Sequence, residues 1–150
     1  MEPVPGMVGI HHVAFAVLDL DAAVDRWTRQ LGAELELRAV VESQGVEAAS
    51  LQWPAAAGSQ RLEHGTLLEL VAPWGEDSGL SRFLESRGEG MHHVAWAVED
   101  TAAALDSLAR AGARVIDEQP RPGLHGTPVA FVHPRSMGGV LVELVEVPSA

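Results

Sequence analysis

Two histidines occupy equivalent places in a repeated stretch of this chain. The segment "HHVAFAV" at 11–17 returns with one letter changed as "HHVAWAV" at 92–98. In each copy the second histidine, His12 or His93, stands at the head of an alternating apolar run that is typical of a β-strand. Imidazole is a common metal ligand, so the repeat makes both histidines candidates for one metal site.

Two glutamates repeat in the same way. The segment "LLELV" at 67–71 is matched by "LVELV" at 141–145, which makes Glu69 and Glu143 equivalent positions. A pseudo-twofold duplication brings equivalent positions together around its axis, so the two histidines and two glutamates are expected to converge on one point. Two imidazoles and two carboxylates suit a divalent first-row metal that keeps positions open for substrate.

The same residues allow an interpretation without a metal. A histidine beside small residues on a strand is more often a hydrogen-bonded core residue than a ligand. Duplication favours the ligand role, because a structural histidine has no reason to recur with a carboxylate in the same relative element. Symmetry that is inherited but unused remains the alternative. His11 and His92 have the opposite parity along their strands, and a structural role is expected for them.

The alternation predicts two different faces for each strand that carries a histidine. Val13, Phe15 and Val17 share one face, and His12, Ala14 and Ala16 share the other. The second copy divides in the same way. The bulky face is expected to pack against other elements, and the small residues beside the histidine are expected to leave open space.

Each half of the chain predicts a strand, a helix and three further strands. The helix-like segments 19–31 and 100–111 follow the first strands and end at Gly32 and Gly112, where a C-terminal glycine belongs. The further apolar runs are 33–41, 46–53 and 66–72, then 113–117, 128–133 and 140–146. The polar segment 55–65, which includes His64, is expected to be a solvated loop.

The length of 150 residues favours a single domain. Within 1–150 we expect two modules, about 8–73 and 90–147, joined by a helical connector at about 76–88. Asp77 or Ser78 is a suitable N-cap for that connecting helix. The two halves are therefore not interpreted as independent domains.

Composition excludes several classes of function. With no cysteine the chain has no disulfide framework, thiolate ligand or cysteine nucleophile. The net charge of -11 disfavours nucleic acid and anionic membrane as partners. The N-terminal "MEPVPGM" has no basic region, and histidines interrupt the next apolar run, so neither a signal peptide nor a membrane span is expected. A cytoplasmic protein is the simplest interpretation.

These motifs resemble the vicinal oxygen chelate superfamily and, within it, the methylmalonyl-CoA epimerases. The resemblance spans nearly the whole chain and is strongest in "GEDSGLSRFLESRGEGMHHVAWAV", "RVIDEQPRPGLHG" and "VAFVHPRSMGGVLVELVE". It implies an α+β fold in which tandem βαβββ modules form a cupped eight-stranded sheet, with a divalent ion of cobalt, manganese, nickel or zinc in the cup. The family's ligands fall on His12, Glu69, His93 and Glu143.

The resemblance also implies a reaction, the interconversion of (2R)- and (2S)-methylmalonyl-CoA through a metal-stabilised enolate. Glu69 and Glu143 are the natural acid/base pair, since epimerisation needs a proton-transfer group on each side of a planar enolate. Some relatives carry a glutamate that is not a metal ligand where this chain has Ala48. The neighbouring Glu47 lies on the opposite face of a strand, so we expect the acid/base role at Glu69, with Glu143 opposite.

Loops rich in Gly, Pro, Arg and His could bind the CoA thioester through backbone N–H groups and positive charge. Ordinary turns are the alternative for any one of these residues. The candidates for substrate contact are Gln44, Arg121, His125, Gly126, Arg135 and Ser136.

Three rivals share much of this pattern: a glyoxalase I-like isomerase, a ring-cleaving dioxygenase, and a drug-binding resistance protein without catalysis. The second-half loops favour a CoA thioester over a glutathione adduct, and four competent ligands argue against the other two. The family resemblance also implies a homodimer. A methyl or an ethyl substituent on the acyl group is left open.

Overall fold

The computed structural model describes residues 2–53 and 67–148 of the chain, so the segment expected to be a solvated loop, with His64, lies outside the described residues. The strands are β1 (Met7–Ala16), β2 (Glu34–Val41), β3 (Val46–Gln52), β4 (Leu67–Pro73), β5 (Gly90–Val98), β6 (Arg121–Pro122), β7 (Pro128–Val132) and β8 (Val142–Glu146). The helices are α1 (Leu20–Leu31), α2 (Gly79–Arg87) and α3 (Thr101–Arg110), with short 3-10 turns η1 (Glu42–Gln44) and η2 (Pro134–Ser136).

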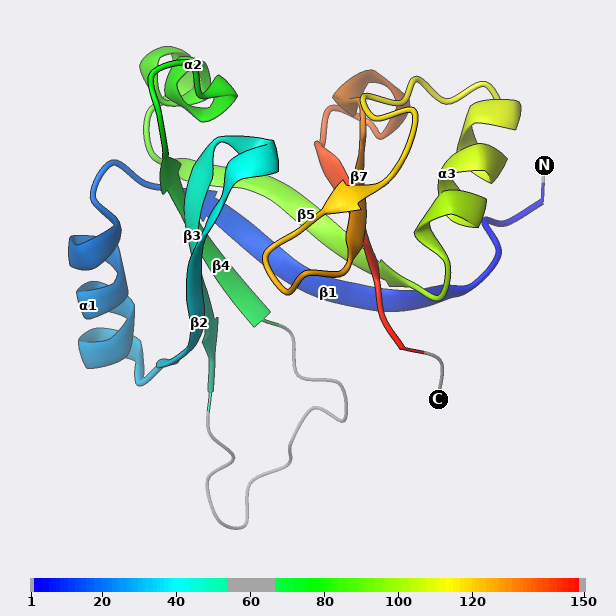
Figure 1. The fold of residues 1–150 in the computed structure, drawn as a ribbon. Helices are drawn as coiled ribbons and strands as arrows, with labels where there is room; N and C mark the ends of the chain where they lie inside the picture. The colour runs from blue at the N-terminus through cyan, green and yellow to red at the C-terminus, as the bar shows by residue number, and fades with distance from the viewer. Residues whose placement is uncertain (1, 54–66, 149–150) are drawn as a thin grey trace, which may run out of the picture. The chain divides into compact units, whose positions relative to one another are not determined.

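In the first half the strands lie in the order β2-β3-β4-β1, and in the second half in the order β5-β8-β7-β6 (Figure 1). In each half the first strand pairs in parallel with the last, β1 with β4 and β5 with β8. The remaining pairs within each half, β2 with β3, β3 with β4, β6 with β7 and β7 with β8, are antiparallel. The predicted α+β class with an eight-stranded sheet is confirmed.

The chain divides into two compact units. One consists of His12–His92 and contains α1, α2 and the strands β2 to β4. The other consists of Met1–His11 together with His93–Ala150 and contains α3 and the strands β6 to β8. The arrangement of two modules within a single domain stays a prediction.

The helices that follow β1 and β5 begin in the same way. The Asp19 carboxylate accepts a hydrogen bond from the backbone N–H of Ala22 at 3.0 Å, and the Asp100 carboxylate accepts one from Ala103 at 2.8 Å. These caps satisfy N–H groups that the first helical turn leaves without partners. Gly32, at φ 68°, ends α1 in the left-handed region that favours glycine. Both predicted helices are confirmed to within a residue or two.

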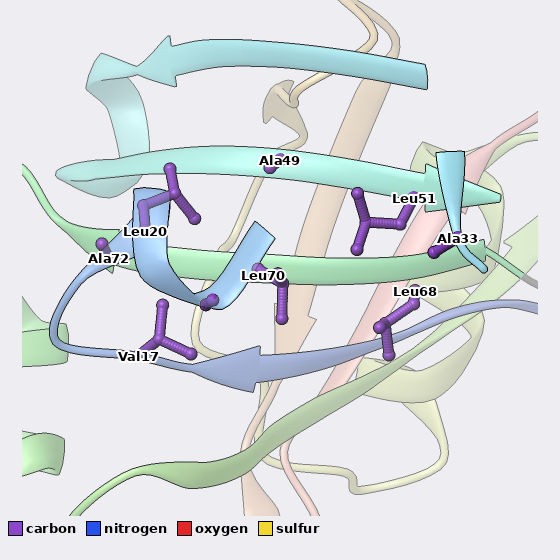
Figure 2. Close-up of a cluster of buried hydrophobic side chains, with 9 residues drawn as sticks. Val17, Leu20, Ala33, Ala49, Leu51, Leu68, Leu70 and Ala72 are labelled. Carbon is purple, nitrogen blue, oxygen red and sulfur yellow. The ribbon is translucent and has the colours of Figure 1, made fainter. Parts of the chain in front are cut away.

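The core of the His12–His92 unit lies between α1 and one face of its strands. Its buried members are Val17, Leu20, Ala23, Ala33, Ala49, Leu51, Leu68, Leu70 and Ala72. Figure 2 shows Leu20 of α1 beside this face, with Leu51 of β3 and Leu70 of β4 directed into the cluster. Phe15 and Trp27 complete it from the edge, with ring centroids 5.7 Å apart. Odd positions of β3 and even positions of β4 therefore face the helix.

Burial on the two faces of β1 differs from the expectation. The small face is covered: His12, Ala14 and Ala16 are 3%, 0% and 0% exposed. On the bulky face Val13 and Phe15 are only half-buried, because one short amphipathic helix shields that side incompletely. The expectation of open space directly above the small residues was wrong.

One predicted strand is largely missing from the second half. Of the expected run 113–117, only Val115 forms an isolated bridge, with Val132, and β6 lies further along the chain. The Asp117 carboxylate accepts a 2.7 Å hydrogen bond from the backbone N–H of Phe131. A side chain thus takes the place of a strand carbonyl, and the proline-containing segment after it cannot continue a regular ladder.

Candidate metal centre

The first histidine–glutamate pair lies within the His12–His92 unit. His12 is on β1 and Glu69 is on the neighbouring strand β4, where Ala14 is the residue opposite Glu69. The Nε2 atom of His12 lies 3.3 Å from Oε2 of Glu69, and both side chains are buried. Because Leu68 and Leu70 face α1, Glu69 faces the other side of the sheet, which is the side of His12.

The second pair has the same construction in the other unit. His93 is on β5 and Glu143 is on β8, with Ala95 opposite Glu143. The Nε2 atom of His93 lies 2.9 Å from Oε2 of Glu143, and the two residues are 2% and 3% exposed. In both units the histidine therefore lies two residues before the alanine that faces the glutamate.

The donor set fits a divalent cation. His12, His93 and Glu143 are buried, and each offers one ligand atom of a type that divalent cations bind. Carboxylates and imidazoles removed from water are costly unless they are paired or coordinate a metal. The buried set of two histidines and one glutamate is consistent with a divalent-metal site. Glu69, the fourth predicted ligand, contacts His12 as described above.

The ring of Phe131 contacts both a histidine of these pairs and a predicted substrate residue. The ring of Phe131 on β7 meets His93 edge-on, with centroids 5.4 Å apart. The guanidinium carbon of Arg121 lies 5.4 Å from the centroid of the same Phe131 ring. Asp117 steadies both groups, since its Oδ1 lies 3.2 Å from Nε of Arg121 while its other oxygen accepts from the Phe131 backbone. Arg121 and His93 therefore contact the same aromatic ring.

The other predicted substrate residues lie in turns. Half-buried Gln44 ends η1, and exposed Arg135 lies in η2. His125 and Gly126 are exposed in the turn before β7, and the His125 ring lies 5.9 Å from that of His11. The Ser136 hydroxyl accepts a 2.7 Å hydrogen bond from the backbone of Arg114. Substrate contact by these residues stays a prediction.

Glu47 lies on the face of β3 opposite to Ala48, as the sequence predicted. Its carboxylate lies 2.9 Å from Nε of Arg38, whose Nη1 is 2.6 Å from Asp21 of α1. The hydrogen bond to Glu47, and then that to Asp21, raises the pKa of the Arg38 guanidinium. Glu47 thus belongs to an ion-pair network on the helix side of β3, whereas Ala48 is fully buried on the opposite face.

Two residues near these pairs were not among the site candidates identified from the sequence. Phe131 lies opposite Glu143 in the β7–β8 ladder, and Ser50 lies opposite Glu69 in the β3–β4 ladder. Each shares the sheet face of the glutamate that it opposes. The sequence signal for Ser50 is a polar residue within the otherwise apolar stretch "AASL" at 48–51.

The comparison with known proteins agrees with this construction. The sequence model of the Glyoxalase/Bleomycin resistance protein/Dioxygenase superfamily matches residues 11–131. The chain is 40% identical over 144 residues to the ethylmalonyl-CoA/methylmalonyl-CoA epimerase of Cereibacter sphaeroides, a match covering 94% of this chain and 100% of that relative. The chain belongs to the methylmalonyl-CoA epimerase family.

Solved structures of methylmalonyl-CoA epimerases share its fold. The Mycobacterium tuberculosis enzyme superposes with a TM-score of 0.85 at 34% identity, covering 100% of this chain and 94% of the other. A variant of the Streptomyces coelicolor methylmalonyl-CoA epimerase, in complex with 2-nitronate-propionyl-CoA, also gives 0.85 at 34% identity, covering 96% and 99%. The predicted glyoxalase fold is confirmed. Within residues 2–53 and 67–148, no helix is long and apolar enough to cross a membrane.

Proposed function

We propose that this chain interconverts (2R)- and (2S)-methylmalonyl-CoA, with a divalent cation held by His12, Glu69, His93 and Glu143. The observation that carries the proposal is the pair of buried histidine–glutamate contacts built with identical register in the two units. Family membership supports the substrate class. The Cereibacter sphaeroides relative is named for both ethylmalonyl-CoA and methylmalonyl-CoA. Ethylmalonyl-CoA is therefore a second candidate substrate.

The proposed reaction moves one proton at C2 of the acyl group. That hydrogen lies between a thioester and a carboxylate and is only weakly acidic. The cation, when bound, supplies positive charge that stabilises the enolate formed as the proton leaves. One of Glu69 and Glu143 takes the proton from one face, and the other, in its protonated form, returns a proton to the opposite face. The two carboxylates exchange roles in the reverse direction.

The surroundings of Ala48 support this assignment of the acid/base pair. An alanine carries no titratable group, and the adjacent Glu47 is engaged by Arg38 on the other face of the sheet. The buried carboxylates within reach of the histidines are then Glu69 and Glu143. Both roles, ligand and acid/base group, are assigned to these two residues.

Arg121 supplies the positive charge that an anionic substrate needs on a chain with a net charge of -11. Its guanidinium is planar and presents several N–H donors, which suits a carboxylate or a phosphate of the CoA thioester. Stacking on Phe131 and contact with Asp117 restrict its side chain before substrate arrives. Less side-chain freedom is then lost on binding.

The decisive experiment is deuterium wash-in at C2 of methylmalonyl-CoA in heavy water, followed by mass spectrometry. Protein loaded with a divalent metal should exchange C2 hydrogen, and chelator-treated protein should not. Loss of exchange that reappears on adding the metal back supports the proposal. Metal-loaded protein that leaves C2 unlabelled, while isomerising a glutathione hemithioacetal, would assign the chain to the glyoxalase type.

Two further proposals concern assembly and location. We propose a homodimer, as the family resemblance implies, and sedimentation of the purified chain tests it because a monomer mass contradicts it. A cytoplasmic location is tested by fractionating cells that express the untagged protein.

A further inference from the structure

We infer that Ser50 is a positioning residue for Glu69. This inference rests on the proposed metal-dependent function and extends it to a side chain without any motif. Ser50 lies directly opposite Glu69 in the antiparallel β3–β4 ladder. Directly opposed residues in such a ladder project from the same face, with Cβ atoms about 4.5–5.5 Å apart. The Ser50 hydroxyl is therefore a neighbour of the Glu69 carboxylate.

The packing of β3 confirms on which side Ser50 projects. Its neighbours Ala49 and Leu51 belong to the cluster beneath α1, so Ser50 between them faces away from the helix. His12 and Glu69 occupy that same opposite face. Ser50 is thus placed beside the first histidine–glutamate pair.

The Ser50 hydroxyl is an unsatisfied polar group at this position. Ser50 is 1% exposed, and its Oγ has no hydrogen-bond partner among residues 2–53 and 67–148. A buried hydroxyl without a partner costs free energy, and an alanine would fit the same place without that cost. A buried hydroxyl without a partner needs an explanation, and a hydrogen bond that forms when the site binds its ligand supplies one.

Glu69 is the partner that the geometry supplies. Its Oε2 lies against Nε2 of His12, and a carboxylate accepts at both oxygens over about four lone-pair sites. Because each carboxylate oxygen has more than one lone-pair site, the oxygen that does not bind the cation can accept from the Ser50 hydroxyl in addition to its other contacts. Such a bond restricts Glu69 to the orientation needed for ligation. Hydrogen bonds of this kind, from groups behind the ligands, typically change metal affinity about 10–100-fold.

The test measures metal binding directly, by calorimetric titration of metal-free protein with manganese(II) or cobalt(II). Ser50→Ala should weaken binding about 10–100-fold. The matched control is Ser86→Ala, which removes an exposed hydroxyl from α2 and should leave affinity unchanged. Thermal denaturation of the metal-free proteins supplies a readout that separates positioning from folding. Ser50→Ala should melt at the wild-type temperature or above it, because it removes an unsatisfied buried group.

A double-mutant cycle with Glu69→Ala tests the route of the effect. If Ser50 acts through Glu69, Ser50→Ala should have no further effect on affinity once Glu69 is alanine. Equal affinity of wild type and Ser50→Ala would overturn the inference while leaving the metal-dependent function intact. An undiminished effect in the Glu69→Ala background would overturn it too. Wild-type protein that binds neither cation would instead remove the proposed function and this inference together.

Discussion

His93 and Glu143 lie on neighbouring parallel strands with Nε2 and Oε2 2.9 Å apart, both almost fully buried. The same relationship recurs between His12 and Glu69, with the same offset along the strands. A contact that is built twice in two units, each time away from the helix-covered core, is difficult to explain by packing alone. Because the contact is repeated, each histidine or glutamate variant has an equivalent variant in the other unit with which it can be compared.

Removing either histidine should impair metal binding to a similar extent. Loss of a group that only orients a ligand lowers metal affinity about 10–100-fold. We expect His12→Ala and His93→Ala, which each remove a ligand, to lower the affinity for manganese(II) by more than this. Calorimetric titration measures this, with His133→Ala as a control in a histidine outside both pairs. If either variant binds the cation as tightly as the wild type, the histidine that it lacks is not a metal ligand.

Replacing either glutamate by glutamine should remove proton transfer while keeping the side-chain shape. Positioned acid/base groups contribute about 10²–10⁴-fold, so turnover of methylmalonyl-CoA by Glu69→Gln or Glu143→Gln should fall by that order. Wash-in from each pure epimer then shows which carboxylate serves which face. Glu47→Gln is the matched control, because Glu47 faces α1 and should leave turnover unchanged. Unimpaired turnover by Glu69→Gln would show that its acid/base assignment is wrong.

Arg121→Gln should mainly affect substrate binding. A hydrogen bond to a charged group contributes about 1.5–3 kcal/mol, which corresponds to roughly a 10–100-fold loss in kcat/KM. We expect most of this loss as a higher KM, since Arg121 is proposed to bind the substrate's anionic groups and not the reacting hydrogen. Steady-state kinetics of the metal-loaded protein measures it. Arg110→Gln, on the exposed surface of α3, is the control, and equal kinetic constants for both variants would exclude a binding role for Arg121.

Cation binding should stabilise the fold by linkage. At a free concentration of 100 times Kd, a ligand that binds only the folded state adds about 2.7 kcal/mol to the free energy of unfolding. Urea denaturation with and without metal measures the difference. The increment should vanish in His93→Ala, which separates specific binding from a general salt effect.

The helix-side core should tolerate truncation poorly. Leu70 is fully buried beneath α1, so Leu70→Ala should lower the free energy of unfolding by about 2–5 kcal/mol through lost burial and a cavity. Leu18→Ala removes the same atoms from a side chain that is 72% exposed and should cost less than about 0.5 kcal/mol. Urea denaturation of the two variants measures both values, and similar losses would contradict the role of this cluster as the core.

The sequence by itself determined the repeated architecture and the two histidine–glutamate pairs. Alternating apolar runs and capping aspartates are local signals, so β1, α1, β5 and α3 could be read with only small errors at their ends. The positions of His12 and Glu69 follow from the repeat because strand periodicity fixes which face a side chain occupies. The same parity argument correctly separated Glu47 from Ala48.

Strand register and long-range side-chain contacts were decided only by the tertiary structure, because the periodicity of apolar residues carries no information about them. The strand expected at 113–117 gave way to a bridge, because Asp117 reaches the backbone of Phe131 across a long sequence separation. The proximity of Arg121 to His93 depends on that same arrangement, and the pairing of Ser50 with Glu69 depends on the register of β3 against β4. Register and long-range side-chain contacts arise from the free energy of the whole fold, which no local pattern of residues records.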